Sequence, residues 1–373
     1  MRVLQVNKFY YPHVGGVEKV VQQLSEQLIT VPGIEVRVLA CHESRRTLRQ
    51  VVRGVDTTYA ASLKTVLGMP VSPAFFREFR SAARQADLIH FHMPFPLAAW
   101  CWPLIPRRAK VVVLYHSDIV RQKKIAFLYH PPLKRLLRRA DAITASSPPM
   151  RQNSPILSEF REKTHVVPFM TDRLAPRNAD LEAEIRRRHG LKPGDAVALY
   201  VGRLVYYKGV TTLLEAWRGV NAKLLMVGDG PMLGEIQDTI ARLGLSDRVI
   251  LAGRAPDEDL PHYYRVADLF VLPSIEVSEA YALVQMDALA AGLPVVNTNL
   301  PTGVPWVSRD GESGITVPPK DADALRDAVV RLLTDTDLRL RMSEGALKRA
   351  RDFTPEHVLA ETLSVYRKVG AEI

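Results

Sequence analysis

Residues 2–24 read RVLQVNKFYYPHVGGVEKVVQQL, and this stretch predicts a strand, a loop with the adjacent glycines Gly15 and Gly16, and an amphipathic helix. The strand and glycine turn recur in the second half of the chain as LLMVGDGP, residues 224–231. Glycines there let backbone N–H groups approach a ligand, and the N-terminus of a helix favours phosphate. Strands alternate with helices throughout, so the sequence predicts an α/β fold with parallel sheets.

Length and patterning predict two domains. A chain of 373 residues exceeds one ordinary hydrophobic core and suits two domains of roughly 150 to 200 residues each. The stretch THVVPF, residues 164–169, predicts the last strand of the first domain, and a polar, charged segment follows it. We therefore expect a first domain over 1–170, a linker with a short helix over 171–195, a second domain over 196–354 and a C-terminal helix within 355–373.

Hydropathy and cysteine usage favour a cytosolic protein. The sequence contains no apolar run near the ~20 residues that cross a bilayer, and no secretory signal is recognisable before the first strand. Its two cysteines, Cys41 and Cys101, have neither metal-binding nor redox spacing, and we expect free thiols in a reducing compartment.

A carboxylate pair marks the second half of the chain. Residues 278–292 read SEAYALVQMDALAAG, with Glu279 just before an apolar helix and Asp287 eight residues later. We expect that helix to start near Tyr281, so that the N–H groups of residues 280–283 face a phosphate while Asp287, two turns in, reaches ribose hydroxyls. An acid at a helix start is equally typical of plain dipole complementation.

Two cations lie on a predicted loop before a helix. Residues 200–209 read YVGRLVYYKG and follow a strand-like run. Arg203 offers a planar fork for phosphate oxygens and Lys208 a compact point charge, so together they suit a departing diphosphate. Each of these segments, taken alone, is also typical of an ordinary turn between a strand and a helix.

Taken together and in order, these segments resemble the retaining glycosyltransferases of family 4, over nearly the whole chain. Two positions depart from the family pattern, because Asp287 stands where the second acid is usually Glu, and Met170 where glycine usually follows VPF. The matching segments are GGVE (15–18), HFHMPFPLA (90–98), YHSD (115–118), VVPFMTD (166–172), VGRLVYYKG (201–209), MVGDGP (226–231), ADLFVLPS (267–274), EAYALVQMDALA (279–290) and DGESGITVPPKD (310–321).

The resemblance implies two facing Rossmann-like domains, the GT-B fold, with the active site in the interdomain cleft and the C-terminal helix crossing back to the first domain. Arg203, Lys208, Glu279 and His116 are the implied catalytic residues: the cations neutralise the diphosphate, Glu279 bonds the transferred sugar, and His116 lines the reacting centre. A histidine after an apolar strand is also typical of a buried, hydrogen-bonded residue. The donor-binding set is Gly15, Gly16, Gly202, Arg254, Ala280, Tyr281, Ala282, Leu283 and Asp287.

A metal and a cofactor are both unnecessary under this interpretation. Three Asp-x-Asp strings occur, at 257–259, 321–323 and 335–337. All three lie at predicted helix starts, where Asp is favoured as a cap. With two cations and a helix dipole available for the leaving group, we expect no metal ligands and no cofactor.

Charge is divided unevenly along the chain. Residues 1–190 carry 30 Lys and Arg against 15 Asp and Glu, a net +15, and residues 191–373 carry 20 against 25, a net −5, which sum to +10. The densest part is the basic strip, residues 121–139, with seven cations and no acid. An anionic membrane surface is the partner that we favour for this strip. Nucleic acid is a second alternative, but the sequence has no fold signature of a nucleic-acid-binding protein. The third alternative is that the strip is only a solvated helix face. The residues expected at the membrane and acceptor are Lys123, Lys124, Lys134 and Arg135.

The resemblance therefore implies a metal-independent retaining hexosyltransferase. We expect it to move a sugar, with mannose from GDP-mannose favoured, from a nucleoside diphosphate to a glycan acceptor, lipid-linked on polyprenyl diphosphate or soluble, at the inner face of the plasma membrane. A UDP-hexose donor is the first alternative. A sugar-nucleotide epimerase and a nonenzymatic sugar-nucleotide-binding protein are further alternatives, and no nucleic-acid partner is expected.

Overall fold

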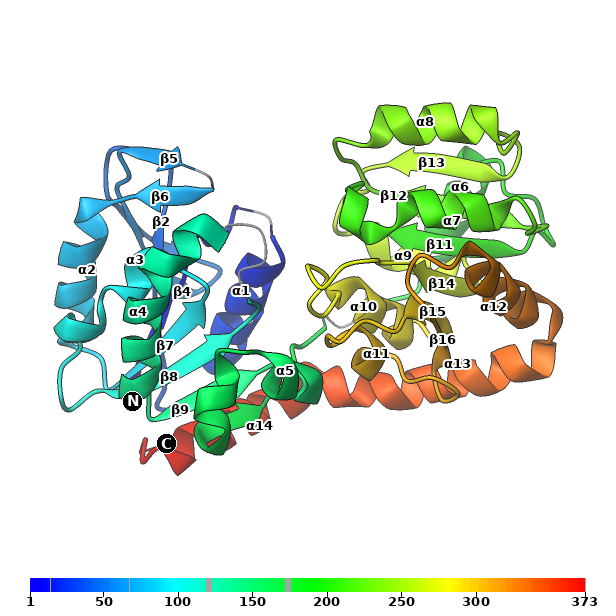
Figure 1. The fold of residues 1–373 in the computed structure, drawn as a ribbon. Coiled ribbons are helices and arrows are strands. Elements are labelled where there is room, and N and C mark those ends of the chain that lie inside the picture. Colours follow the sequence, from blue (N-terminus) through cyan, green and yellow to red (C-terminus); the bar gives the residue numbers. More distant parts are fainter. Residues whose placement is uncertain (14, 67, 119–122, 172–175, 373) are drawn as a thin grey trace. The chain divides into compact units, whose positions relative to one another are not determined.

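The chain divides into two compact units. The computed structural model describes residues 1–13, 15–66, 68–118, 123–171 and 176–372, with the side chains of helix α4 (Lys123–Arg139) described from Tyr129 onward. Unit 1 comprises Met1–Met170 together with Pro355–Ile373, and unit 2 comprises Thr171–Thr354 (Figure 1). Unit 1 is therefore built from two stretches of chain that flank unit 2 in sequence.

Unit 1 is built on an eight-stranded sheet. Its order is β10-β9-β8-β7-β1-β2-β4-β3, and neighbours pair in parallel except β3 with β4. A short antiparallel hairpin, β5–β6, lies outside it. The strands are β1 (Arg2–Val6), β2 (Glu35–Cys41), β3 (Leu48–Val52), β4 (Val55–Ala60), β5 (Lys64–Val66), β6 (Met69–Val71), β7 (Leu88–Met93), β8 (Lys110–Tyr115), β9 (Ala142–Ala145) and β10 (Thr164–Val166).

Helices cover this sheet and complete its core. Ser72 and Ser147 cap α2 and α5 by accepting hydrogen bonds from backbone N–H groups of the first turn. The C-terminal helix α14 packs against α1 and contributes Val358 and Tyr366 to the apolar core of the unit. The helices, besides α4, are α1 (Gly16–Leu28), α2 (Pro73–Ala83), α3 (Pro96–Ala99), α5 (Pro148–Asn153) and α14 (Pro355–Lys368), with single 3₁₀ segments η1 (Trp102–Leu104) and η2 (Leu157–Lys163).

Unit 2 contains a six-stranded sheet in which all neighbours are parallel. Its order is β13-β12-β11-β14-β15-β16, so the first strand lies in the middle and the connections run outward from it in both directions. In such a doubly wound sheet, ligands bind at the carboxyl ends of the strands where the order reverses, here between β11 and β14. The strands are β11 (Val197–Val201), β12 (Lys223–Val227), β13 (Val249–Gly253), β14 (Leu269–Leu272), β15 (Val295–Thr298) and β16 (Gly314–Val317).

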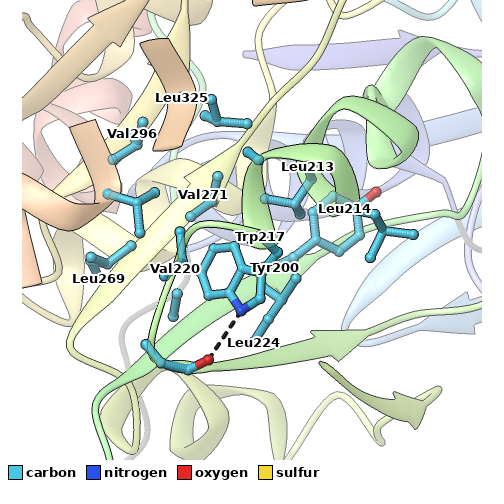
Figure 2. Close-up of a cluster of buried hydrophobic side chains, with 14 of the residues drawn as sticks. Tyr200, Leu213, Leu214, Trp217, Val220, Leu224, Leu269, Val271, Val296 and Leu325 are labelled. Atoms are coloured by element: carbon cyan, nitrogen blue, oxygen red, sulfur yellow. Dashed lines mark hydrogen bonds between the residues drawn. The ribbon is translucent and has the colours of Figure 1, made fainter. Parts of the chain in front are cut away.

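Trp217 lies at the centre of the unit 2 core. It is fully buried among residues such as Leu213, Val271 and Val296, and its indole N–H donates to the Ala222 carbonyl at 3.1 Å (Figure 2). That bond satisfies the one polar group that the indole brings into the core. The helices of the unit are α6 (Ala179–Arg188), α7 (Val210–Trp217), α8 (Leu233–Arg242), α9 (Leu260–Arg265), α10 (Leu283–Ala290), α11 (Val304–Val307), α12 (Ala322–Thr334) and α13 (Thr336–Ala350), with η3 (Tyr206–Lys208) and η4 (Arg351–Phe353).

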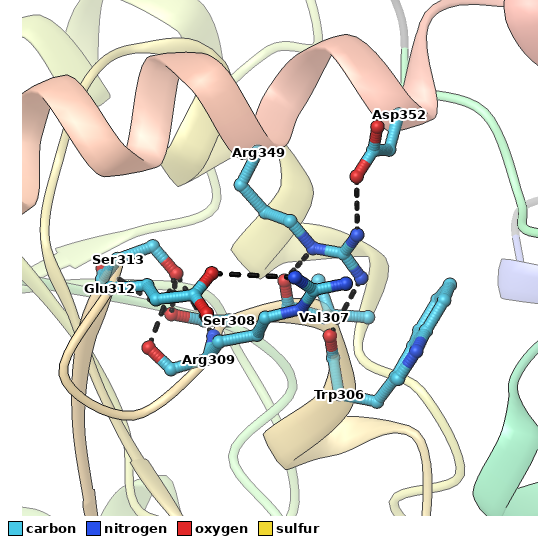
Figure 3. Close-up of polar contacts among 8 residues, drawn as sticks. All are labelled: Trp306, Val307, Ser308, Arg309, Glu312, Ser313, Arg349 and Asp352. Atoms are coloured by element: carbon cyan, nitrogen blue, oxygen red, sulfur yellow. Dashed lines mark hydrogen bonds and ion pairs between the residues drawn. The ribbon is translucent and has the colours of Figure 1, made fainter.

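A buried arginine fixes the end of α13. The Arg349 guanidinium donates to the carbonyls of Trp306 and Val307 at 2.7 and 3.1 Å and pairs with Asp352 (Figure 3). It also lies over the rings of Trp306 and Phe353. Its donors are therefore paired although the side chain is buried, as a buried charge requires. This contact joins α11 to the last residues of unit 2.

Two of the three Asp-x-Asp strings cap helices, as the sequence predicts. Asp321 accepts from the Ala324 N–H at 2.9 Å, and Asp335 accepts from the Leu338 N–H at 2.9 Å. The third string differs, because Asp259 stands at the start of α9 without a capping hydrogen bond from its side chain. The prediction of capping was wrong for that string.

Candidate functional site

The two central residues of the predicted donor site meet at the switch point of unit 2. Lys208 ends the loop after β11 and Glu279 lies in the loop after β14, and Lys208 Nζ lies 2.5 Å from Glu279 Oε2. The Ser274 hydroxyl donates to the same carboxylate oxygen at 3.1 Å. Both ionic side chains keep only 9% of their surface exposed. The structure thus joins the cation and the first acid of the sequence prediction into one buried pair.

Glycines let these loops approach one another. Gly209 has φ +68°, and a Cβ there would stand 1.9 Å from the Pro273 carbonyl oxygen, so only glycine allows the loop after β11 to lie against the loop after β14. Gly228, with φ +145°, lies equally close to the backbone of Gly202, where a Cβ would stand 2.0 Å from the carbonyl oxygen. The N–H of Gly202 donates to the Val227 carbonyl at 3.0 Å. The turns after β11, β12 and β14 therefore form one compact edge.

Arg203 belongs to this edge and its side chain is exposed. The carbonyl of Arg203 accepts a hydrogen bond from the Tyr200 hydroxyl at 3.2 Å, which anchors the backbone of the loop and leaves the guanidinium outside the core. Arg254, after β13, is exposed as well. Because β13 is the edge strand beyond β12, the order of the sheet places Arg254 two strands from the Lys208 loop.

The helix after Glu279 begins later than the sequence predicts. Helix α10 starts at Leu283, and Ala282 adopts a left-handed conformation with φ 60° before it. Residues Ala280 and Tyr281 therefore belong to the loop, and the helix start near Tyr281 was wrong by two residues. Asp287 consequently lies one turn into α10, ~6 Å along the axis from Leu283, rather than two turns.

Asp287 has a protein partner that the sequence did not reveal. Its Oδ1 accepts a hydrogen bond from the Thr171 hydroxyl at 2.5 Å. Tyr264 packs beneath this end of α10 and donates to the Val284 carbonyl at 3.1 Å. Burial raises the pKa of Tyr264, and the Asp287 carboxylate raises it further. Asp287 therefore accepts from a neighbouring hydroxyl, which is the chemistry that ribose recognition requires.

His116 directly follows β8 in unit 1 and is only 4% exposed. Its Nε2 lies 3.0 Å from Nδ1 of His92, and its ring stacks between those of His92 and Phe169. Burial lowers the pKa of His116 to about 3. The sequence alternative of a buried, hydrogen-bonded histidine is therefore correct for the surroundings of His116. With this lowered pKa, the imidazole is neutral at physiological pH.

The first glycine of the pair in unit 1 lies against a side chain of the chain itself. A Cβ at Gly15 would stand 2.1 Å from Glu18 Oε2, so the Glu18 carboxylate lies directly against Gly15. Gly16 is the first residue of α1. A ligand that approaches Gly15 from the side of its missing Cβ would therefore meet the Glu18 carboxylate, which the sequence pattern did not show.

The described part of the basic strip lies along α4. Lys134 pairs with Glu159, and Arg135 is exposed with its guanidinium 5.9 Å from the centre of the Trp102 ring. The side chains of Lys123 and Lys124 lie outside the described residues, as do residues 121 and 122. The 3₁₀ segment that carries Trp102 packs against α4, and Trp100 beside it is 50% exposed. The exposed cation Arg135 therefore lies near Trp102, and the half-exposed Trp100 precedes that residue by two positions.

Within the described residues, no group of three or more His, Cys, Asp or Glu side chains is placed to hold a metal ion. No helix of the described chain combines the length and apolar character that crossing a bilayer requires.

Comparison with known proteins identifies the family. A model for Glycosyltransferase Family 4 matches residues 14–172, and a model for Glycosyl transferases group 1 matches residues 182–349. The chain is 31% identical over 370 residues to O-antigen chain mannosyltransferase C of Escherichia coli, covering 98% of both proteins. The chain belongs to glycosyltransferase family 4. This glycosyltransferase is also 34% identical to D-rhamnosyltransferase WbpZ of Pseudomonas aeruginosa, over 88% of its own length and 86% of that protein.

Solved structures confirm the GT-B fold of this glycosyltransferase, with two Rossmann-like units. A sucrose-phosphate synthase from Thermosynechococcus elongatus matches with a TM-score of 0.79 at 23% identity, covering 99% of both chains. HepE of Anabaena, solved in complex with UDP, matches with a TM-score of 0.78 at 20% identity, covering 98% of this chain and all of that one. At these identities the likeness concerns the fold alone.

Proposed function

We propose that this glycosyltransferase moves a hexose from a nucleoside diphosphate sugar to a glycan hydroxyl with retention of anomeric configuration. The observation that carries the proposal is the buried pair of Lys208 and Glu279 at the switch point of unit 2. Doubly wound sheets bind ligands at this position, outside the carboxyl ends of the strands. A cation and an acid that touch here can part to bind a phosphate and a sugar hydroxyl, respectively.

The proposed chemistry needs no metal and no enzymic nucleophile. The bond between C1 of the sugar and the β-phosphate oxygen breaks, and a bond from C1 to the acceptor oxygen forms on the same face. The acceptor proton passes to the departing phosphate oxygen. Lys208 and Arg203 neutralise the diphosphate as its charge develops, with help from the N–H groups at the start of α10.

The donor is proposed from the relatives. Because the relatives include a mannosyltransferase and a rhamnosyltransferase, we favour mannose from GDP-mannose, with a uridine donor as the alternative. The acceptor is proposed to be a glycan on polyprenyl diphosphate in the synthesis of a surface polysaccharide, because the first of these relatives is named for the O-antigen chain.

A panel of radiolabelled sugar nucleotides tests this proposal. The protein is incubated with each donor and bacterial membrane extract, with and without EDTA, and the anomeric configuration of the product is read by NMR. We expect transfer from GDP-mannose, unchanged by EDTA, with a retained configuration. Isomerised donor without transfer would indicate an epimerase, binding without turnover would indicate a nonenzymatic protein, and either result would refute the proposal.

The membrane is the proposed second partner. Exposed Arg135 and the half-exposed Trp100 on the adjoining segment supply a cation and an aromatic anchor of the type found at bilayer interfaces. We propose a cytoplasmic enzyme held reversibly at the inner face of the plasma membrane. Its test is vesicle co-sedimentation of wild type and of a variant in which four residues of the strip become Gln: Lys123, Lys124, Lys134 and Arg135.

A further inference from the structure

A line of polar contacts runs through the core of unit 1 and ends at His116. Nε2 of His116 lies 3.0 Å from Nδ1 of His92, and Nε2 of His92 lies 2.7 Å from Oε1 of Gln5. The three side chains come from the neighbouring strands β1 and β7 and from the residue after β8. All three are at most 4% exposed.

These contacts determine which nitrogen of each ring carries the proton. An amide oxygen only accepts hydrogen bonds, so Nε2 of His92 must donate to Gln5 Oε1. In a neutral imidazole the other nitrogen then holds a lone pair, so Nδ1 of His92 accepts from Nε2 of His116. His116 is consequently protonated on Nε2, and its Nδ1 is an acceptor.

The Gln5 side chain also lies near Tyr366. Burial raises the pKa of Tyr366 and Gln5 offsets part of that rise, while Nε2 of Gln5 is buried without a hydrogen-bond partner. The Tyr366 hydroxyl in turn lies 2.7 Å from Nδ1 of His90. Reversing the amide would turn its oxygen toward Tyr366 and its nitrogen toward His92.

Ring stacking prevents the histidines from turning out of this line. The ring of His92 stacks on His90 at 4.9 Å and on His116 at 5.3 Å, and His116 stacks on Phe169 at 5.3 Å. The interplanar angles within this stack lie between 24° and 29°. Such a packed stack fixes both the position and the plane of the His116 ring.

We propose that Gln5 and His92 are positioning residues that hold His116 in its Nε2–H tautomer, so that Nδ1 accepts a hydrogen bond from a hydroxyl of the sugar substrate. The proposal rests on the proposed function and on the resemblance of YHSD (115–118) to the family pattern, which implies that His116 lines the reacting centre. His116 then orients the sugar as an acceptor and delivers no proton to the reaction. Burial, which lowers the pKa of His116 to about 3, keeps this state throughout the working pH range.

The tautomer is measured directly by NMR, without any assay of activity. Protein labelled with ¹⁵N-histidine gives long-range ¹H–¹⁵N correlations whose pattern distinguishes Nε2–H, Nδ1–H and cationic rings. The His116 signals are assigned by their loss in His116→Asn. We expect the Nε2–H pattern for His116, unchanged between pH 6 and 8. An Nδ1–H or cationic pattern would overturn the proposal, whatever the enzyme transfers.

Three variants separate positioning from mere core packing. His92→Phe keeps a stacked ring but removes the acceptor, so the His116 pattern should become mixed and kcat should fall about tenfold, the size of effect expected for one lost hydrogen bond. Donor affinity should fall by less than kcat, because the proposed phosphate and ribose contacts, which lie in unit 2, remain. His92→Asn can still accept at the position of Nδ1 and should restore most of the lost rate.

His90→Phe is the matched control, since it makes the same substitution on the same strand. It removes the hydrogen bond to Tyr366 and leaves the contact between His92 and His116 in place. It should leave the His116 pattern as in wild type. Equal spectral changes in His90→Phe and His92→Phe would show that the stack acts only as packing and would refute the positioning role. Absence of transfer from every donor, with the expected His116 spectrum, would instead refute the proposed function alone.

Discussion

Replacing Lys208 by Met leaves a buried carboxylate without its counter-charge. Nζ of Lys208 lies 2.5 Å from Glu279, and each side chain is 9% exposed. At an effective dielectric constant near 20, a pair this close attracts by about 7 kcal/mol, and desolvation offsets most of that gain. Removing one partner leaves the other charge buried and unpaired, which costs about 3–5 kcal/mol of stability. Because Ser274 still donates to Glu279, we expect a loss near 3 kcal/mol.

Urea denaturation followed by circular dichroism measures this loss, and a double-mutant cycle identifies its cause. Lys208→Met with Glu279→Gln should recover most of the stability, because no uncompensated charge remains. Arg187→Met, which removes the exposed ion pair with Glu184, is the matched control and should change stability little. Both Lys208 variants should lose roughly 10²- to 10³-fold in kcat. A single variant as stable as wild type would refute the reasoning about this pair.

Four further outcomes are expected. Asp287→Ala should weaken donor binding, measured by calorimetry, whereas Asp287→Glu should retain part of the donor affinity. Equal affinities in wild type and Asp287→Ala would mean that ribose is held elsewhere. Gly228→Ala should destabilise by at least about 2 kcal/mol, because its Cβ meets the backbone at 2.0 Å, whereas Gly234→Ala, which has open space in α8, should be neutral or stabilising. Burial lowers the pKa of His90 and His116 to about 3, so below pH 6.5 the unfolded chain binds protons that the folded chain does not. Stability to urea should fall between pH 6.5 and 5 by about 1.6 kcal/mol for each ring, and a flat profile would contradict neutral burial. The four-residue Gln variant of the basic strip should no longer bind anionic vesicles at physiological salt, whereas its transfer to a soluble acceptor should continue. Undiminished vesicle binding would mean that the strip is only a solvated face.

Local patterns were sufficient to predict parallel α/β sheets and to single out Lys208 and Glu279 as residues of one site, but not their direct ion pair. Lys208 and Glu279 each follow a strand by a short loop, and adjacent parallel strands bring such loops to one edge. That reasoning needs no knowledge of packing. The start of α10 was missed because Ala282 takes a left-handed conformation, which L-residues other than Asn and Asp rarely adopt, so the sequence gives no sign of it.

Contacts between distant residues were beyond the reach of pattern analysis. Thr171 and Asp287 are 116 positions apart, and their hydrogen bond depends on how the first residue of unit 2 returns to α10. Glu18 covering Gly15 depends on one side-chain rotamer. The direction of the hydrogen bonds from Gln5 to His116 depends on strand order, which places β1 beside β7 and β7 beside β8.

The division of unit 1 into two stretches of chain constrains the order in which the protein can fold during synthesis. Unit 2 is continuous, so it can fold as soon as Thr354 has left the ribosome. Unit 1 must wait, because α14 supplies Tyr366 and other core side chains and emerges only after all of unit 2. The first 170 residues therefore spend the synthesis of unit 2 with an apolar surface uncovered. A nascent chain stalled before α14 should bind chaperones, and release of α14 should end that binding.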